Sequence, residues 1–126
     1  ENAGNAPVTV AMQVRAEMSP GEVDAASYAF ARASGERVSR KLMEAGEQPV
    51  GKEAWNTGDG PAGLFSFTPS AGKAFVTRFE KAQTPRSYVS WTGKSRGGVT
   101  FGVWSEEKAL MPGERMTIEA MHGVAR

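Results

Sequence analysis

Hydrophobic and polar residues alternate one by one along residues 8–18 of the chain. The apolar positions are spaced by two residues, with mainly polar or charged residues between them: Val8, Val10, Met12, Val14, Ala16 and Met18. Because successive side chains of a β-strand point to opposite sides, this alternation predicts a strand with one buried and one solvent-exposed face.

Between residues 20 and 45 the spacing of apolar residues is close to the period of an α-helix. The residues that would share the buried face are Val23, Ala26, Phe30, Ala33, Val38, Leu42 and Ala45. Ser19 and Glu22 form a capping box at the start, and Gly46 is typical of the residue that follows a helix. The pattern therefore predicts one long amphipathic helix, although Gly35 in its interior would cost about 1 kcal/mol relative to alanine.

From residue 62 the apolar residues again recur at every second position. This alternation predicts strands at residues 64–68, 75–82, 87–92, 99–105 and 115–122, joined by turns rich in Gly, Pro and Ser. Residues 47–61 are rich in Gly, Pro, Asn and Asp, and we expect a long loop there with Trp55 as its only large apolar residue.

The order strand, helix and then strands predicts an α+β fold. One long helix, about residues 20–45, would pack on a curled, mostly antiparallel sheet of about six strands. A partly closed barrel that holds the helix is the alternative arrangement. We expect residues 1–7 to be a flexible leader and residues 8–126 to form a single domain.

The chain contains no cysteine and a single histidine, His122. This composition excludes disulfides and thiolate metal sites, and it removes most nucleophile–base pairs. We therefore expect no metal site and no cofactor, and we assign no catalytic residue. Fifteen Lys and Arg residues against fourteen Asp and Glu residues leave a net charge of +1, which disfavours a dedicated nucleic-acid binder.

The position of the protein in the cell is suggested by its first residue, Glu1. A chain that begins with Glu is typical of proteolytic processing, of which removal of a secretory signal is one example. We expect a periplasmic or secreted location, with the cytoplasm as the alternative. No apolar run approaches the roughly 18 residues of a membrane-spanning helix, so we expect no membrane span.

Residues 86–104 bring aromatic and basic side chains together in one predicted hairpin. Tyr88 and Trp104 lie opposite the apolar faces of their strands and are expected to be exposed beside Arg86, Lys94 and Arg96. Aromatic rings flanked by cations can stack against a base of single-stranded nucleic acid or against a sugar. The alternation along the two strands favours ordinary core packing of the aromatic residues with a solvated basic turn, and ligand stacking is the alternative. Trp55, in the predicted loop, is expected to pack down onto the core, and contact with a partner is the alternative.

The sequence favours a non-enzymatic exported domain that acts in binding or assembly through protein–protein contacts, including self-association through a sheet edge. Two alternatives stay open. One is a single-stranded nucleic-acid or carbohydrate binder that uses the hairpin 86–104. The other is a small carboxylate-dependent hydrolase, with Glu106, Glu107 and Glu119 as the acids to test.

Overall fold

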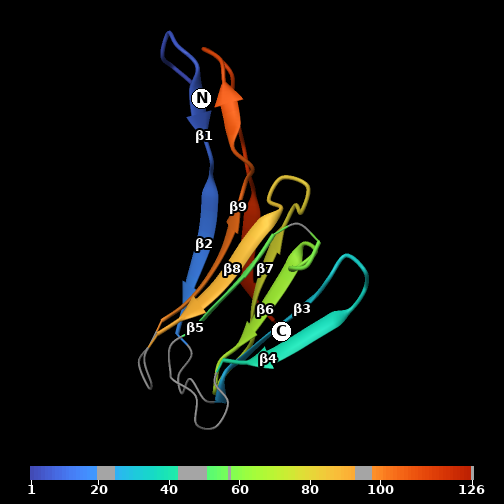
Figure 1. Ribbon diagram of the computed structural model, residues 1–126. Helices are drawn as coiled ribbons and strands as arrows, with labels where there is room; N and C mark the ends of the chain where they lie inside the picture. The colour runs from blue at the N-terminus through green and yellow to red at the C-terminus, as the bar shows by residue number, and fades with distance from the viewer. Residues whose placement is uncertain (20–24, 43–50, 57, 93–97, 126) are drawn as a thin grey trace.

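The computed structural model describes residues 1–19, 25–42, 51–56, 58–92 and 98–125. In these residues the regular structure consists of β-strands, without an α-helix (Figure 1). The strands are β1 (Val8–Val10), β2 (Gln13–Met18), β3 (Ser27–Ala31), β4 (Arg37–Lys41), β5 (Gly51–Trp55), β6 (Leu64–Thr68), β7 (Phe75–Phe79), β8 (Arg86–Trp91), β9 (Val99–Trp104), β10 (Lys108–Leu110) and β11 (Ala120–Val124).

Nine strands form two antiparallel sheets that pack face to face as a β-sandwich. The five-stranded sheet has the order β11-β7-β6-β3-β4, and the four-stranded sheet has the order β2-β9-β8-β5. Strands β1 and β10 form a separate two-stranded ribbon, which continues β2 and β9 and projects from one end of the sandwich (Figure 1).

Aromatic side chains from both sheets fill the space between them. Phe65 of β6 stacks on Phe101 of β9, with the ring centroids 3.9 Å apart and an angle of 2° between the ring planes. Tyr28 of β3 meets the edge of Trp55 of β5 at 6.2 Å. Each of these rings is almost fully buried. Their contacts join segments that are far apart in the sequence, and burial of these large apolar surfaces stabilises the sandwich.

The prediction of a helix over residues 20–45, and with it the α+β fold class, is wrong. Residues 25–42 form the hairpin of β3 and β4, in which Phe30 pairs with Val38. The chain reverses at Ala33, Ser34 and Gly35, where Gly35 has a φ of 89° that side-chain-bearing L-residues rarely adopt. A three-residue loop that ends in such a glycine is a common hairpin connection.

The physical reason for the error is that the apolar residues between positions 26 and 30 fit both the spacing of a helix and the two-residue alternation of a strand. Ala26, Tyr28 and Phe30 alternate strictly and are all buried, whereas the helical pattern used only Ala26 and Phe30. Pairing with β6 on one side and β4 on the other outweighs the weak helical preference of the segment. The predicted capping residue Glu22 and the predicted stop Gly46 lie outside the described residues.

Other predicted strands agree better with the structure. The strand at 64–68 is confirmed as β6, and those at 75–82, 87–92 and 99–105 correspond to β7, β8 and β9. The alternation over 8–18 belongs to two strands, β1 and β2, rather than one. The last strand begins at Ala120 and not at Arg115.

The expectation of a loop over residues 47–61 is wrong for β5, which pairs antiparallel with β8. The structure also contains β10, which the sequence pattern did not predict. The described part of the chain includes no helix that is long and apolar enough to cross a membrane.

Candidate binding surface

The outer face of the four-stranded sheet carries two aromatic side chains in neighbouring strands. In the register of the sheet, Trp104 of β9 lies between Gln13 of β2 and Arg86 of β8, and Tyr88 lies opposite Gly102. Side chains that alternate with these, such as Val89 and Phe101, point into the core. We call the group Gln13, Lys52, Arg86, Tyr88 and Trp104 the aromatic platform.

Gly102 allows the ring of Tyr88 to lie against the sheet. A Cβ atom at Gly102 would lie 2.4 Å from Cε1 of Tyr88, a distance that no real contact tolerates. Gln13 Nε2 donates a hydrogen bond to the Tyr88 hydroxyl at 2.7 Å. The ammonium of Lys52 lies 5.3 Å from the centroid of the Tyr88 ring. These contacts fix the ring and place a cation against it.

Arg86 and Trp104 form the second pair of the platform. The guanidinium carbon of Arg86 lies 6.0 Å from the centroid of the Trp104 ring. Arg86 Nη2 donates a hydrogen bond to the carbonyl of Ser105 at 3.0 Å, while its Nε is buried without a hydrogen-bond partner in the part of the chain that the structure describes. A buried donor without a partner is costly, so this position of the Arg86 side chain is held at some expense in stability.

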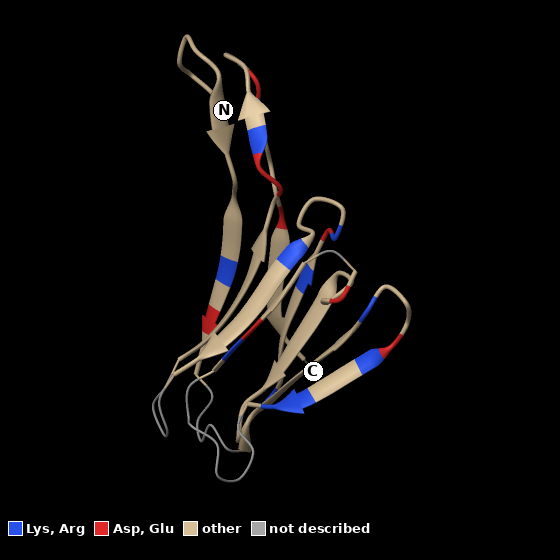
Figure 2. Ribbon diagram, in the orientation of Figure 1, with Lys and Arg blue, Asp and Glu red and all other residues tan. Residues whose placement is uncertain are grey.

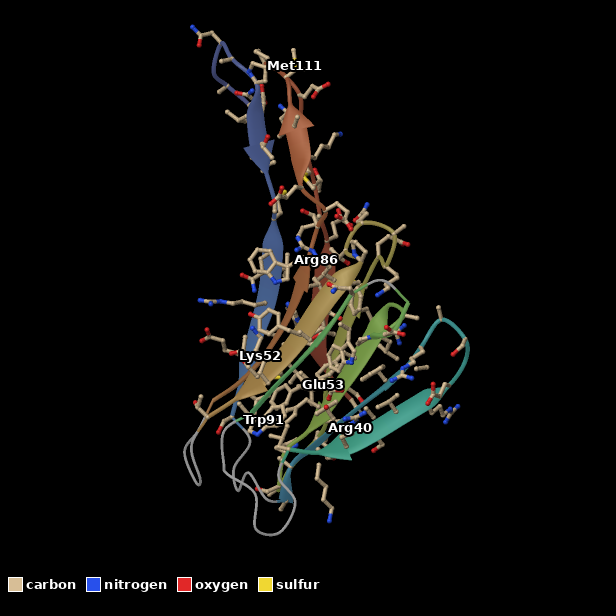
Figure 3. The ribbon with its side chains drawn as sticks, in the orientation of Figure 1. Arg40, Lys52, Glu53, Arg86, Trp91 and Met111 are labelled. Atoms are coloured by element: carbon tan, nitrogen blue, oxygen red, sulfur yellow. The ribbon has the colours of Figure 1, made fainter. Side chains whose placement is uncertain are left out.

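A shallow cavity of about 390 Å³ joins the two pairs. The platform residues line it together with Ala54, Trp55, Asn56 and Ser87. Lys52 and Arg86 both lie on this sheet in Figure 3, and neither forms an ion pair with another described residue. Two cations without carboxylate partners give the surface a positive potential.

The structure brings three of the sequence candidates together: Arg86, Tyr88 and Trp104 all line this cavity. Trp55 also lines it, although its side chain is 6 % exposed and packs against Phe30 in the core. Lys94 and Arg96 lie outside the described residues.

The sequence pattern missed Lys52 because it assigned the whole of residues 47–61 to a loop. A signal was present in the alternation of Gly51, Glu53 and Trp55 with Lys52 and Ala54. That pattern is short and has only one large apolar residue, so it is weak evidence for a strand without its partner β8.

A second polar cluster closes one flank of the sandwich, between the edge strands β4 and β5. Tyr28 donates a hydrogen bond from its hydroxyl to Glu53, and Arg40 Nη1 lies 3.3 Å from the same carboxylate. Burial raises the pKa of Glu53, and a hydrogen bond from Trp55 partly offsets that rise. Arg40 comes from β4 of the five-stranded sheet and Glu53 from β5 of the four-stranded sheet (Figure 3). The cluster joins the inner faces of both sheets.

The carboxylates and the histidine considered for catalysis are dispersed. Glu106 and Glu107 are exposed at the end of β9. Glu119 lines a cavity of about 310 Å³ together with Glu80. His122 is exposed on β11, with Nδ1 3.0 Å from the Thr77 hydroxyl. In the described ranges no three His, Asp or Glu side chains are grouped so that they could hold a metal ion.

No model of a known protein family and no curated protein matches this chain. The role of the aromatic platform therefore has to be inferred from its own residues.

Proposed function

We propose that this protein is a binding domain that acts through protein–protein contacts and uses the aromatic platform as its contact surface. The observation that carries the proposal is the grouping of Trp104, Tyr88 and Arg86 on one face around a shallow cavity. Tryptophan, tyrosine and arginine are the residues that most often dominate the binding energy of protein interfaces.

The charge of the platform defines the partner. Lys52 and Arg86 have no carboxylate partner among the described residues. A partner with Asp or Glu side chains would supply carboxylates to both cations, and hydrogen bonds between charged groups contribute about twice as much as neutral ones. The partner we propose is therefore an acidic segment or surface of a protein.

Stacking of a nucleobase or a sugar on Tyr88 and Trp104 is the second candidate, because both rings have a cation beside them. The same cations weigh against it. The ammonium of Lys52 and the guanidinium of Arg86 lie at the ring faces, so a stacked ligand would have to displace them. A protein carboxylate approaches the cations without that cost, which favours the protein partner.

A peptide display experiment tests the proposal. Random peptides of about 15 residues are selected on the wild-type domain, long enough to cover a shallow surface. We expect the selected peptides to be acidic. Lys52→Ala or Arg86→Ala should weaken their binding at least about tenfold, or about 1.4 kcal/mol. Arg78→Ala, which removes an exposed cation from the other sheet, should leave the affinity unchanged.

A single-stranded oligothymidylate provides the competing arm of the same experiment. Two results together would favour nucleic-acid binding over our proposal. The oligothymidylate would bind in a salt-sensitive way that is lost in Tyr88→Ala, and the selected peptides would not be acidic. Peptides that bind Lys52→Ala and Arg86→Ala as well as the wild type would reject the platform as the contact surface.

An exported location is a further part of the proposal. Fractionation of cells that make the tagged, full-length protein tests it, and recovery of the protein with the cytoplasmic fraction would contradict it.

A further inference from the structure

Among the described residues, four strands lie at the edges of the two sandwich sheets: β11 and β4 in one, β2 and β5 in the other. Three of these strands carry charged side chains, and Figure 2 shows them clearly on β2 and β4. The charged residues are Arg37, Arg40, Lys41, Arg15, Glu17, Lys52 and Glu53. Strand β11 contains no Lys, Arg, Asp or Glu. Because charges on edge strands prevent pairing with other chains, β11 is the least protected edge of the two sandwich sheets.

The side chains of β11 are also among the most exposed apolar groups. Met121 is 68 % exposed and Val124 is 53 % exposed. Met121 pairs with Arg78 on the outer face of the sheet, whereas His122 and Val124 belong to the inner face, opposite Thr77 and Phe75. An apolar edge strand that is exposed on both faces can accept a further strand.

We propose that β11 pairs antiparallel with β11 of a second copy of this chain, around a two-fold axis at His122. In this register His122 lies opposite itself, Met121 opposite Gly123, and Ala120 opposite Val124. Each pair joins a larger residue to a smaller one, apart from the histidine on the axis. A Cβ atom at Gly123 would meet nothing within 4 Å, so this position has space for the side chain of the partner's Met121. The two five-stranded sheets then form one continuous sheet.

Charge favours a second copy as the occupant. The chain has a net charge of only +1, so two copies repel each other weakly. Self-pairing of β4 in the same way would place Arg37 opposite Lys41, and like charges in opposite positions destabilise a sheet. The β11 pair opposes no two carboxylates and no two Lys or Arg side chains.

The pairing is independent of the aromatic platform, which lies on the other sheet. One strand from each copy gives a small interface, so we expect a weak dimer. It should become populated only as the protein concentration approaches about 0.5 mM. If no dimer is found, the proposed binding function of the aromatic platform is not affected. If the platform binds no acidic peptide, the proposed pairing of β11 is not affected either.

Sedimentation velocity over a range of concentrations tests the proposal in the intact chain. We expect the wild type to dimerise and Met121→Lys to weaken dimerisation at least tenfold, because it restores a charge to the edge. Met111→Lys is the matched control. Met111 is 53 % exposed at the far end of the projecting ribbon (Figure 3), and its replacement should not change the dimer. Equal loss of dimer in both variants would overturn the proposal.

Disulfide cross-linking tests the register directly, because the chain has no cysteine of its own. His122→Cys places the two thiols opposite each other on the axis and should form a covalent dimer under oxidising conditions. In Ala120→Cys the two thiols lie about 13 Å apart along the strands, too far for a disulfide. A wild type that stays monomeric while His122→Cys cross-links no faster than Ala120→Cys refutes the pairing.

Discussion

Replacing Gly35 by alanine distinguishes a hairpin from a helix over residues 27–41 by the sign of its effect on stability. In the structure Gly35 has a φ of 89° and its N–H donates to the carbonyl of Arg32 at 2.9 Å. Arg32 in turn donates its N–H to the carbonyl of Glu36 at 2.8 Å, which closes the loop between β3 and β4.

The magnitude follows from two opposing terms. A left-handed backbone conformation costs an L-residue with a side chain roughly 1–2 kcal/mol. Alanine also lowers the conformational entropy of the unfolded chain, which raises the free energy of unfolding by about 0.4–1 kcal/mol and opposes the first term. A Cβ atom at position 35 would meet no atom within 4 Å, so no clash adds to the cost. We expect Gly35→Ala to lower the free energy of unfolding by about 1 kcal/mol. In a helix the same substitution would raise it by about 1 kcal/mol.

Urea unfolding followed by tryptophan fluorescence measures the change. With a slope of about 1–3 kcal/mol/M, the midpoint should fall by roughly 0.3–1 M at unchanged slope. Gly98→Ala is the control, because Gly98 has no positive φ and its Cβ position is also open. That variant should be unchanged or slightly more stable. A Gly35→Ala protein that is more stable than the wild type would refute the hairpin.

Three further predictions concern the platform, the core and the polar flank. Gly102→Ala should displace the Tyr88 ring and break the hydrogen bond between Gln13 and the Tyr88 hydroxyl, which lowers the free energy of unfolding by about 0.5–1.5 kcal/mol. Unchanged stability in urea would contradict the position of the ring. A double-mutant cycle of Phe65→Leu and Phe101→Leu should give a coupling of about 0.5–1.5 kcal/mol, whereas purely additive effects would argue against the stacked pair. Because burial raises the pKa of Glu53 above 4.5, the folded state holds this proton more tightly than the unfolded state. Stability should therefore fall as the pH rises through the interval between 4.5 and the raised pKa. Glu53→Gln should lessen that fall in urea titrations at a series of pH values, and identical pH profiles would count against the assignment.

The candidate surface was partly accessible from the sequence. Alternation around Tyr88 and Trp104 correctly placed both rings opposite the apolar faces of their strands, since this depends only on the two-residue period of a strand. Lys52 and Gln13 could not be assigned to the same surface, because they come from strands β5 and β2 that are distant in the sequence. Their position depends on which strands pair and in which register.

The sequence by itself determined the local features of this protein: the strands β6 to β9, the side of its strand on which each of the half-buried Tyr88 and Trp104 lies, and the lack of cysteine chemistry. Only the tertiary structure decided that residues 27–41 are a hairpin and that Gly51–Trp55 is a strand. A short segment whose apolar residues fit both the helical and the strand period has nearly the same local energy as a helix and as a strand. Pairing with β6 and with β8 supplies the hydrogen bonds and buried area that select the strand, and those partners lie far away in the chain.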